Sequence, residues 1–540
     1  MDRNSQIKFY TDKLKDDEIL LLKSSDSFFK CHYKGSPLNV LTNFQGTAGE
    51  AVINKVGEIT LFVDTRYHIL ADKQVFKDIK VYKMDLGETF IGALKKTYKE
   101  GKTIYIPSDI MFEEFLKFDK IFNIKTYKLK KSFLNNLDIN KNESLFLVDS
   151  KVEKNDFNYK VKKFKKLNPN IEKMLVFDLD KISYFTNLRS FEMKYSSNFR
   201  SILYLDFKNS KYILFTDNLL KDIYIENLAI KKLNEFENVI SAIDSDICVD
   251  YSEITLDNIL LIKKHERMKS DNLSLISSIK PISVIENMAE CSSKLDRAIY
   301  NFKKRINKGF SEFDLVEMFE DELKAQGSYS PSFKTILAID NNSASIHYSS
   351  YDKNKILKEE QLILLDCGGY WDSGYATDIT RTFYYGKNPK PIYKNIYTAV
   401  LKAFIACFNS KETSARKVDA LARKMLASYQ DIGFYFNHGL GHGIGTSCHQ
   451  NPPLLSMYSN DTIKPYQTHS IEPGLYGKID EDEFGVRIEN CVYCDINYNR
   501  FSLSKFPFEE VLIDYRALNN KEIDFIKKWQ ADFEEQIEFY

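Results

Sequence analysis

The chain lacks an excess of charge of either sign, because its 76 Lys and Arg residues balance 76 Asp and Glu residues. A net charge of zero argues against a global basic field of the kind that binds nucleic acid or an anionic membrane. The chain also lacks any apolar stretch that approaches the roughly 18–20 residues of a membrane span. Its first residues, MDRNSQIKFYTDKLKDDEILLL, contain no uninterrupted apolar segment of the signal-peptide kind. We therefore expect no nucleic-acid partner and no membrane association.

Cysteine is scarce as well, with eight residues in 540 and no spacing that forms a disulfide framework. Cys491 and Cys494 make one CxxC, but no second CxxC accompanies it, and the surrounding IENCVYCDI is typical of a strand. Packing thiols explain this pair better than a zinc or redox motif. Reduced thiols are typical of the cytoplasm, where we expect the protein to reside.

A chain of 540 residues is too long for a single core and should divide into domains. Residues 1–140 and 145–285 both alternate strand and helix patterns and resemble variants of one α/β unit, with a polar linker near 134–144. In the first block, LNVLTNFQGTAGEAVIN (38–54) predicts strand, turn and strand. Residues 286–540 open with helical periodicity and continue with antiparallel strands, so the predicted class is α+β.

Isolated acidic residues on apolar strands are the most informative feature of the last third. Burying a carboxylate without a partner is costly, so several such residues together indicate ligands of divalent cations. The fold must gather them from distant segments, which makes the site tertiary. The five candidates are Asp366 in LLDCGG, Asp378 in TDITRTF, His442 in HGLGHGIG, Glu472 in IEPGLY and Glu489 in GVRIEN.

The segment QLILLDCGGYWDSGYATDITRTF predicts a β-hairpin whose turn is Asp372-Ser373-Gly374. Asp366 and Asp378 would lie on its two arms and meet at one edge of the sheet. Such an arrangement suits two ions about 3.5–4 Å apart. Either aspartate alone could equally be a turn or capping residue.

Histidines gather in the same region. His438 and His442 lie in a segment with four glycines, NHGLGHGIG, which is too glycine-rich for the helix of an HExxH zinc site. The alternative is a glycine-rich loop with two exposed histidines. His347 and His449 are weaker candidates, because a lone histidine is more often structural.

Arg487 and Glu489 are two residues apart on a predicted strand and should share one face. The arginine could orient a ligand carboxylate by a charge-assisted hydrogen bond or form a plain salt bridge. Four carboxylates and one imidazole without thiolate form a hard donor set that suits Mn²⁺ better than structural zinc. Two such ions would lower the pKa of a shared water and polarise a carbonyl, which predicts hydrolysis.

The order of these five residues, with HGLGHGIG, EPGLY and GVRIEN, resembles the pita-bread metallopeptidases. FQGTAGEAVI with LFVDTRY, KISYFTNLR, and SFKTILAIDNNSASIHY resemble segments of the cytosolic, three-domain aminopeptidase P (X-prolyl aminopeptidase) family. The resemblance implies two α/β creatinase-like domains, 1–140 and 145–285, before a pita-bread catalytic domain, 286–540. It also implies a homodimer formed through the non-catalytic domains.

The resemblance implies a role for each site residue. Asp366 would chelate one metal ion, and His442 with Glu472 the other. Asp378 and Glu489 would bridge the two ions, and Glu472 would serve as the general base. His438 and His449 would contact the substrate and stabilise the tetrahedral intermediate, with His347 in the same pocket and Tyr476 and Arg487 in support. The implied substrates are peptides with proline at the second position.

Three departures from the family pattern bear on this interpretation, one being that segment 286–310 is shorter than the family's opening helices. Asp366 and Asp378 are twelve residues apart, where the family usually has eleven, and we expect the Asp372–Gly374 turn to absorb the extra residue. Gln450 stands where the family often has glutamate. Three alternatives follow: a prolidase acting on dipeptides, a pita-bread binding module without metal, and creatinase-like chemistry without metal. Two N-terminal domains argue against the first alternative, and the five ligands argue against the other two.

Overall fold

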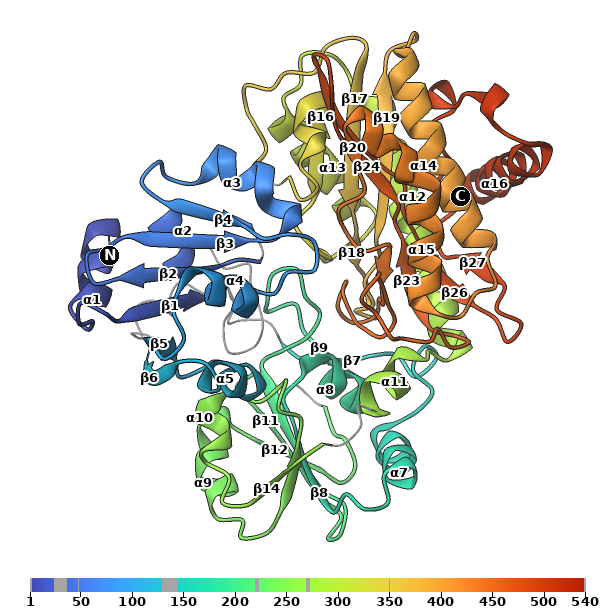
Figure 1. Ribbon diagram of the computed structural model, residues 1–540. Coiled ribbons are helices and arrows are strands. Elements are labelled where there is room, and N and C mark those ends of the chain that lie inside the picture. The colour runs from blue at the N-terminus through green and yellow to red at the C-terminus, as the bar shows by residue number, and fades with distance from the viewer. Residues whose placement is uncertain are drawn as a thin grey trace.

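The computed structural model describes residues 2–23, 36–46, 48–128, 144–218, 223–268, 272–348 and 350–538. Three parts follow one another along the chain; in Figure 1 the first lies to the left of the third, and the second lies below them. Of the linker predicted near 134–144, only residue 144 belongs to the described residues. Among the described helices, none is both long and apolar enough to cross a membrane.

The first part is a six-stranded sheet in the order β4-β3-β2-β1-β5-β6 with helices around it. Residues 59–63 of one central strand are all buried, as are residues 19–22 of another, as expected for a sheet covered on both faces. The strands are β1 (Ile19–Lys23), β2 (Glu50–Asn54), β3 (Ile59–Val63), β4 (Lys80–Lys83), β5 (Thr103–Pro107) and β6 (Asn123–Tyr127). The helices are α1 (Arg3–Thr11), α2 (Pro37–Thr42), α3 (His68–Gln74), α4 (Phe90–Thr97) and α5 (Phe112–Asp119).

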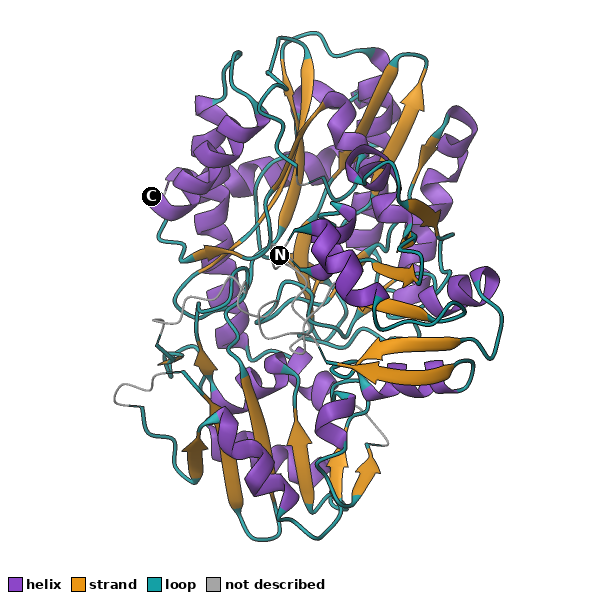
Figure 2. Cartoon of the chain, turned by 90° about the vertical axis from the view of Figure 1, so that its left-hand side faces the viewer, coloured by secondary structure: helices purple, strands orange, loops and turns teal. Residues whose placement is uncertain are grey.

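The second part repeats this plan with the order β12-β11-β10-β8-β13-β14. Figure 2 shows its strands side by side in the lower part of the molecule with helices packed across them. The strands are β8 (Lys173–Val176), β10 (Ser201–Asp206), β11 (Lys211–Thr216), β12 (Leu228–Lys231), β13 (Ile247–Val249) and β14 (His265–Arg267). The helices are α7 (Phe157–Leu167), α8 (Leu179–Thr186), α9 (Phe236–Ser241), α10 (Leu256–Ile259) and α11 (Asn272–Ser278), and β7 (Phe146–Leu147) pairs with β9 (Leu188–Arg189).

The two sheets share one topology. In the first sheet β2 pairs antiparallel with β1 and β3, and in the second β10 pairs antiparallel with β8 and β11. The outer pairs are parallel in both sheets. The prediction that both blocks are variants of one α/β unit is therefore confirmed. The domain boundaries themselves stay a prediction.

One predicted strand is wrong. Residues 38–42 form part of α2 because Ser36 and Pro37 start a helix there: the Ser36 hydroxyl accepts a hydrogen bond from the Asn39 amide, and proline occupies the first turn. Asn43 ends the helix in the left-handed conformation, with a φ of 63°. The apolar residues within 38–42 suggested a strand because the segment is too short to show a helical period.

The third part places long helices around several small sheets (Figure 1). The helices are α12 (Ile282–Arg305), α13 (Glu312–Ala325), α14 (Pro391–Asn409), α15 (Ala415–Leu426) and α16 (Asn520–Glu538). One sheet holds β16 (Ile336–Ile339), β17 (Gln361–Cys367) and β19 (Ile379–Tyr385); another holds β20 (Phe434–Tyr435), β24 (Gly474–Ile479) and β25 (Asp482–Arg487). A third holds β23 (Thr468–Ile471), β26 (Asn490–Cys494) and β27 (Arg500–Ser502). Two short pairs join β15 (Ser330–Pro331) to β18 (Gly369–Tyr370) and β21 (Gly441–His442) to β22 (Leu454–Leu455).

Helix α13 has a defined cap at each end. Ser311 and Asp314 form a reciprocal capping box at its start, and Gly327, with a φ of 81°, follows its last turn. The helix packs its apolar face onto the core beneath β16 and β17, so it supports the strand that carries Asp366.

The second part also holds a loop of the third. The Ser197 hydroxyl donates to the Thr446 carbonyl at 3.0 Å, and the Asn198 amide donates to the Ser447 hydroxyl at 3.0 Å. The Thr446 hydroxyl in turn donates to Asp180. The loop that follows His442 is therefore fixed by residues more than 240 positions earlier in the chain.

Candidate metal centre

The predicted hairpin is confirmed by the antiparallel pairing of β17 with β19, in which Asp366 lies opposite Thr380. Asp378 precedes Thr380 by two residues and so belongs to the same face as Asp366. A turn closed by the Gly374 amide and the Trp371 carbonyl, 2.8 Å apart, lies at the tip of the hairpin. Both carboxylates line one pocket. Absorption of the extra residue by this tip stays a prediction.

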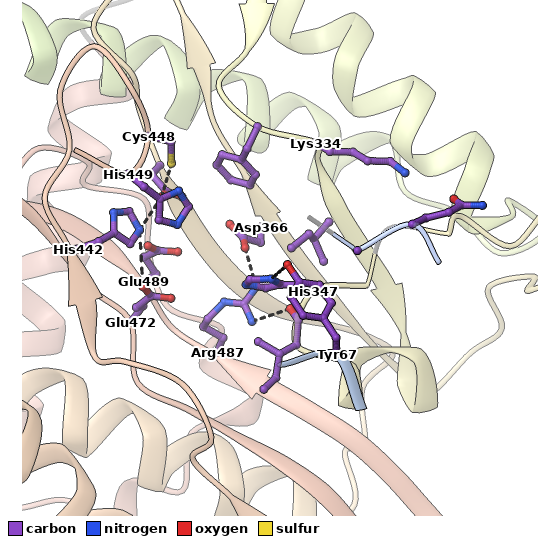
Figure 3. Close-up of a pocket in the computed structure, with 16 residues that line it drawn as sticks. Tyr67, Lys334, His347, Asp366, His442, Cys448, His449, Glu472, Arg487 and Glu489 are labelled. Carbon is purple, nitrogen blue, oxygen red and sulfur yellow. Dashed lines mark hydrogen bonds and ion pairs between the residues drawn. The ribbon is translucent and has the colours of Figure 1, made fainter. Parts of the chain in front are cut away.

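The other three candidates reach the same pocket from different strands (Figure 3). His442 ends β21, Glu472 follows β23, and Glu489 lies between β25 and β26. The His442 Nε2 atom lies 3.5 Å from Asp378 Oδ2 and 3.6 Å from Glu472 Oε1. Ligand atoms of Asp378, His442 and Glu489 all lie within 4.8 Å of one another. The structure thus brings all five sequence-predicted ligands together.

Several oxygen atoms of these carboxylates are buried without a hydrogen-bond partner: Asp366 Oδ1, Asp378 Oδ1 and Glu489 Oε1. Burial raises the pKa of all three carboxyl groups, and the neighbouring carboxylates raise those of Asp378 and Glu489 further. Such a cluster is unfavourable as it stands, and cations bound between the unpartnered oxygens would compensate it.

The imidazole and the fourth carboxyl group fit the same interpretation. Burial lowers the pKa of His442 to about 4, so its ring is neutral and able to bind a metal at neutral pH. Burial also raises the pKa of Glu472 to about 8, opposed by the Arg487 guanidinium and reinforced by Asp366. An acidic, oxygen-rich set with one neutral imidazole fits divalent cations.

Arg487 lies at the centre of a hydrogen-bond network behind the carboxylates. Its Nη2 donates to Asp366 Oδ2 at 2.6 Å, its Nη1 to the Tyr476 hydroxyl at 2.7 Å and its Nε to the Thr380 hydroxyl at 2.9 Å. The Tyr476 hydroxyl lies 3.0 Å from His438 Nε2. The sequence placed Arg487 and Glu489 on one strand. Instead β25 ends at Arg487, and the carboxylate that the guanidinium contacts is Asp366.

The predicted substrate residues fall into two groups. His347, His449 and Arg487 line the pocket, and His449 is exposed. His438 and Tyr476 are buried behind the pocket lining, where His438 Nδ1 lies 3.8 Å from Glu472 Oε2. His438 is therefore close enough to Glu472 to influence the carboxyl group electrostatically.

Sequence reasoning missed two polar residues of the centre. The Thr380 hydroxyl donates to Glu489 Oε2 at 2.7 Å, and the Cys448 thiol donates to Asp378 Oδ2 at 3.0 Å. Strand alternation from Asp378 could have indicated Thr380, since both share a face. The sequence feature that could have indicated Cys448 as part of the centre is its position next to His449.

The first part of the chain supplies one wall of the pocket through Gln45, Gly46 and Tyr67. The Tyr67 hydroxyl lies 2.9 Å from His347 Nδ1, and the Thr65 hydroxyl donates to the Asn437 carbonyl at 2.9 Å. No local pattern in LFVDTRY predicts a contact with a residue 280 positions away.

Gln450 faces away from the metal centre. Its side-chain oxygen accepts hydrogen bonds from the Thr446 amide at 3.0 Å and from Lys280 Nζ at 3.3 Å. The residue closes the loop that carries Cys448 and His449. Glutamine in place of the family's usual glutamate therefore concerns the contacts that hold the loop carrying Cys448 and His449.

Comparison with known proteins shows which family this chain resembles. Residues 286–495 match the model of metallopeptidase family M24. The chain is 26% identical to Xaa-Pro aminopeptidase 1 of Dictyostelium discoideum, over 92% of this chain and 86% of that protein. It is 32% identical to an Xaa-Pro dipeptidase of Pyrococcus horikoshii, over 48% of this chain and 74% of that protein.

The fold is also similar to a solved structure. The X-prolyl aminopeptidase of Caenorhabditis elegans, described as a cytosolic enzyme with a di-nuclear active site, superposes with a TM-score of 0.83. At 20% identity the match covers 96% of this chain and 91% of the other. The predicted fold class, a pita-bread catalytic domain after two α/β domains, is confirmed by this match and by the family model. Its sequence and fold together identify the chain as a member of metallopeptidase family M24.

Proposed function

We propose that this metallopeptidase is an X-prolyl aminopeptidase, which hydrolyses the bond between an N-terminal residue and a following proline. The observation that carries the proposal is the meeting of five ligand side chains and two pocket-lining histidines around buried, unpartnered carboxylate oxygens. The likeness to Xaa-Pro aminopeptidases along 92% of the chain supports it. Proline's tertiary amide lacks an N–H, so such bonds need a dedicated enzyme.

The proposed centre holds two divalent ions, with Mn²⁺ favoured by the hard donor set. Asp366 would serve one ion, His442 and Glu472 the other, and Asp378 and Glu489 both. When bound, the ions would supply Lewis acidity toward the scissile carbonyl and an activated water.

The residues of the chain would do the rest. Glu472 would take the proton of the attacking water. His438, 3.8 Å from Glu472, belongs to the catalytic set through that contact. His449 and His347 line the pocket and would contact the peptide, and His449 would stabilise the tetrahedral intermediate. Arg487 and Tyr476 would keep Asp366 and His438 in place.

The proposal extends to partners and location. Its substrates are peptides with proline in second position, and a homodimer in the cytoplasm is part of the prediction. The unpaired thiols of all described cysteines agree with a reducing compartment.

The test is hydrolysis of Arg-Pro-Pro beside Arg-Ala-Pro, with Mn²⁺, with chelator and with Asp378→Ala protein. We expect Mn²⁺-dependent release of arginine from the proline peptide alone, lost in the variant. Asp372→Ala removes an exposed carboxylate from the same hairpin and should leave activity unchanged. No release of arginine by metal-loaded protein would overturn the proposal.

A prolidase remains the second candidate, because the P. horikoshii Xaa-Pro dipeptidase is 32% identical to part of the chain. The dipeptide Arg-Pro separates the two. Cleavage of Arg-Pro without cleavage of Arg-Pro-Pro would indicate a dipeptidase.

A further inference from the structure

A lysine lines the same pocket as the five proposed ligands. Lys334 lies in the short segment between β15 and β16. Figure 3 shows its side chain on the far side of Asp366 from His442, with the ammonium group directed away from the ligand carboxylates. Arg487, the other Lys or Arg among the described residues that line this pocket, donates to Asp366 within the ligand cluster. The pocket therefore carries a second cationic group apart from the metal ligands.

The surroundings of this ammonium group are largely apolar and aromatic. Phe333, Ile336 and Ile346 line the pocket together with Lys334, whose side chain is half-buried. The Lys334 Nζ atom lies 4.9 Å from the centre of the Tyr351 ring, a cation–π contact that helps to hold the charge in place. Because water has limited access there, an ion pair with a ligand would be stronger than in bulk solvent.

The charges around Lys334 also favour an anionic ligand. Burial lowers the pKa of Lys334, Lys194 lowers it further, and Glu320 opposes both effects. Burial and the second lysine thus disfavour the ammonium form. A carboxylate placed against Lys334 would counter both influences, since an opposite charge within a few ångströms stabilises the charged form.

We propose that Lys334 is a specificity-determining residue that binds a carboxylate of the peptide substrate while the metal centre holds the scissile bond. The inference rests on the proposed function and deepens it by naming a substrate class. Two sources supply such a carboxylate: an acidic side chain at the first or third position, and the C-terminal carboxylate of a tripeptide. All present the same group to the lysine, and a set of matched peptides separates them.

Four peptides identify the source of the carboxylate. Ala-Pro-Ala-amide carries none and is the reference, whereas Glu-Pro-Ala-amide, Ala-Pro-Glu-amide and free Ala-Pro-Ala each carry one. With Mn²⁺-loaded wild-type protein, we expect at least one of the three to have a KM about tenfold below that of the reference. Its kcat should change little, because the contact is remote from the reacting atoms and is made in the ground state and the transition state alike. No such difference for any of the three peptides would overturn the proposal.

Substitutions at Lys334 test whether this residue causes the preference. Lys334→Met keeps an unbranched stem without the charge and should abolish the preference. Lys334→Glu should reverse it, so that Lys-Pro-Ala-amide or Ala-Pro-Lys-amide becomes the better substrate. Lys353→Met is the matched control, because Lys353 also makes a cation–π contact, 4.1 Å from the centre of the Phe313 ring, but is exposed and does not line the pocket. The control should keep the preference, and a preference that survives in Lys334→Met would overturn the proposal.

Peptide binding separates this proposal from the proposed function. Cleavage of all four peptides with equal kcat/KM would leave the X-prolyl aminopeptidase and remove the role of Lys334. If no peptide is cleaved, the proposed function is wrong, and calorimetric titration of the Mn²⁺-loaded protein with the same peptides still tests the lysine. Tighter binding of a carboxylate-bearing peptide by wild type than by Lys334→Met would then support the anion subsite, and equal Kd values would overturn it.

Discussion

Arg487 Nη2 donates to Asp366 Oδ2 at 2.6 Å, and both side chains are buried. This ion pair joins the end of β25 to β17, the middle strand of the sheet β16-β17-β19, and satisfies one of the two carboxylate oxygens of Asp366. The other oxygen faces the pocket without a partner among the described residues. The arginine therefore orients Asp366 with its free oxygen toward the proposed metal position.

Arg487→Ala should damage both metal binding and folding. Breaking a buried ion pair costs about 3–5 kcal/mol, and losing the partner of a metal ligand weakens metal affinity about 10–100-fold. Mn²⁺ titration and denaturant unfolding measure the two effects. Arg487→Lys retains the charge without the planar fork and should recover stability better than metal affinity. Wild-type Mn²⁺ affinity in Arg487→Ala would refute the orienting role.

Tyr67→Phe should lower kcat/KM for the proline peptide by about tenfold, which corresponds to one lost hydrogen bond of about 1–1.5 kcal/mol. The Tyr67 hydroxyl contacts His347 from the opposite wall of the pocket. Tyr127→Phe is the control: its buried hydroxyl donates to the Leu21 carbonyl at 2.7 Å within the same part of the chain. That variant should lose stability without a comparable loss of kcat/KM. Equal kinetic effects in both variants would mean that Tyr67 acts only through folding.

Two single-residue deletions in the hairpin should have opposite outcomes. Deleting the exposed Asp372 shortens the tip to the usual family spacing, and we expect Mn²⁺ binding to survive. Deleting Ile379, which pairs with Cys367, shifts β19 by one residue against β17 and turns one of the two aspartates to the opposite face. Calorimetric titration with Mn²⁺ would then show no binding. Retained binding after the Ile379 deletion would show that the register does not set the site.

Lys280 should make stability depend on pH. Burial lowers its pKa from 10.5 to about 8, opposed by Glu153 and Asp180. Between these two values the unfolded state binds more protons than the folded state, so stability rises with pH across that window. The unfolding free energy of wild type relative to Lys280→Met should therefore be higher at about pH 10 than at about pH 7. The side-chain oxygen of Gln450 contacts the Lys280 ammonium. Gln450→Glu would place a carboxylate there, which favours the charged lysine, so the pH dependence of stability should become smaller. A constant difference between wild type and Lys280→Met would contradict the lowered pKa.

Chelation should destabilise the protein. The buried carboxyl groups of Asp366, Asp378 and Glu489 then each keep one oxygen without a hydrogen-bond partner. A bound ion stabilises the folded state by about 4 kcal/mol at a thousandfold excess over its Kd. Adding Mn²⁺ should raise Tm in wild type but not in Asp378→Ala. An equal rise in both proteins would indicate binding elsewhere.

The sequence indicated the centre well because its chemistry is concentrated in short segments. Asp366 and Asp378 are recognisable because each is an acidic residue within an apolar strand pattern. The predicted hairpin then indicated that both side chains lie at one edge of the sheet. The twofold α/β plan was also visible, since buried strands read as continuous apolar runs.

The sequence could not show which distant groups meet. The contacts of Arg487 with Asp366 and of Tyr67 with His347 form only because separate sheets pack together. The helix at 38–42 was missed because a cap, at Ser36 and Pro37, outweighed an apolar pattern only a few residues long. Local patterns report propensity and burial, whereas these contacts depend on tertiary packing.

The bonds from Ser197 and Asn198 to Thr446 and Ser447 have a consequence for evolution and engineering. Every proposed ligand lies in the last third of the chain, yet the loop next to His449 is held by residues that precede β10 in the second part. Excising residues 286–540 would release that loop, so this catalytic part of the chain cannot be expected to work when separated from the rest. Substitutions that loosen the second sheet could therefore slow the enzyme without touching its pocket.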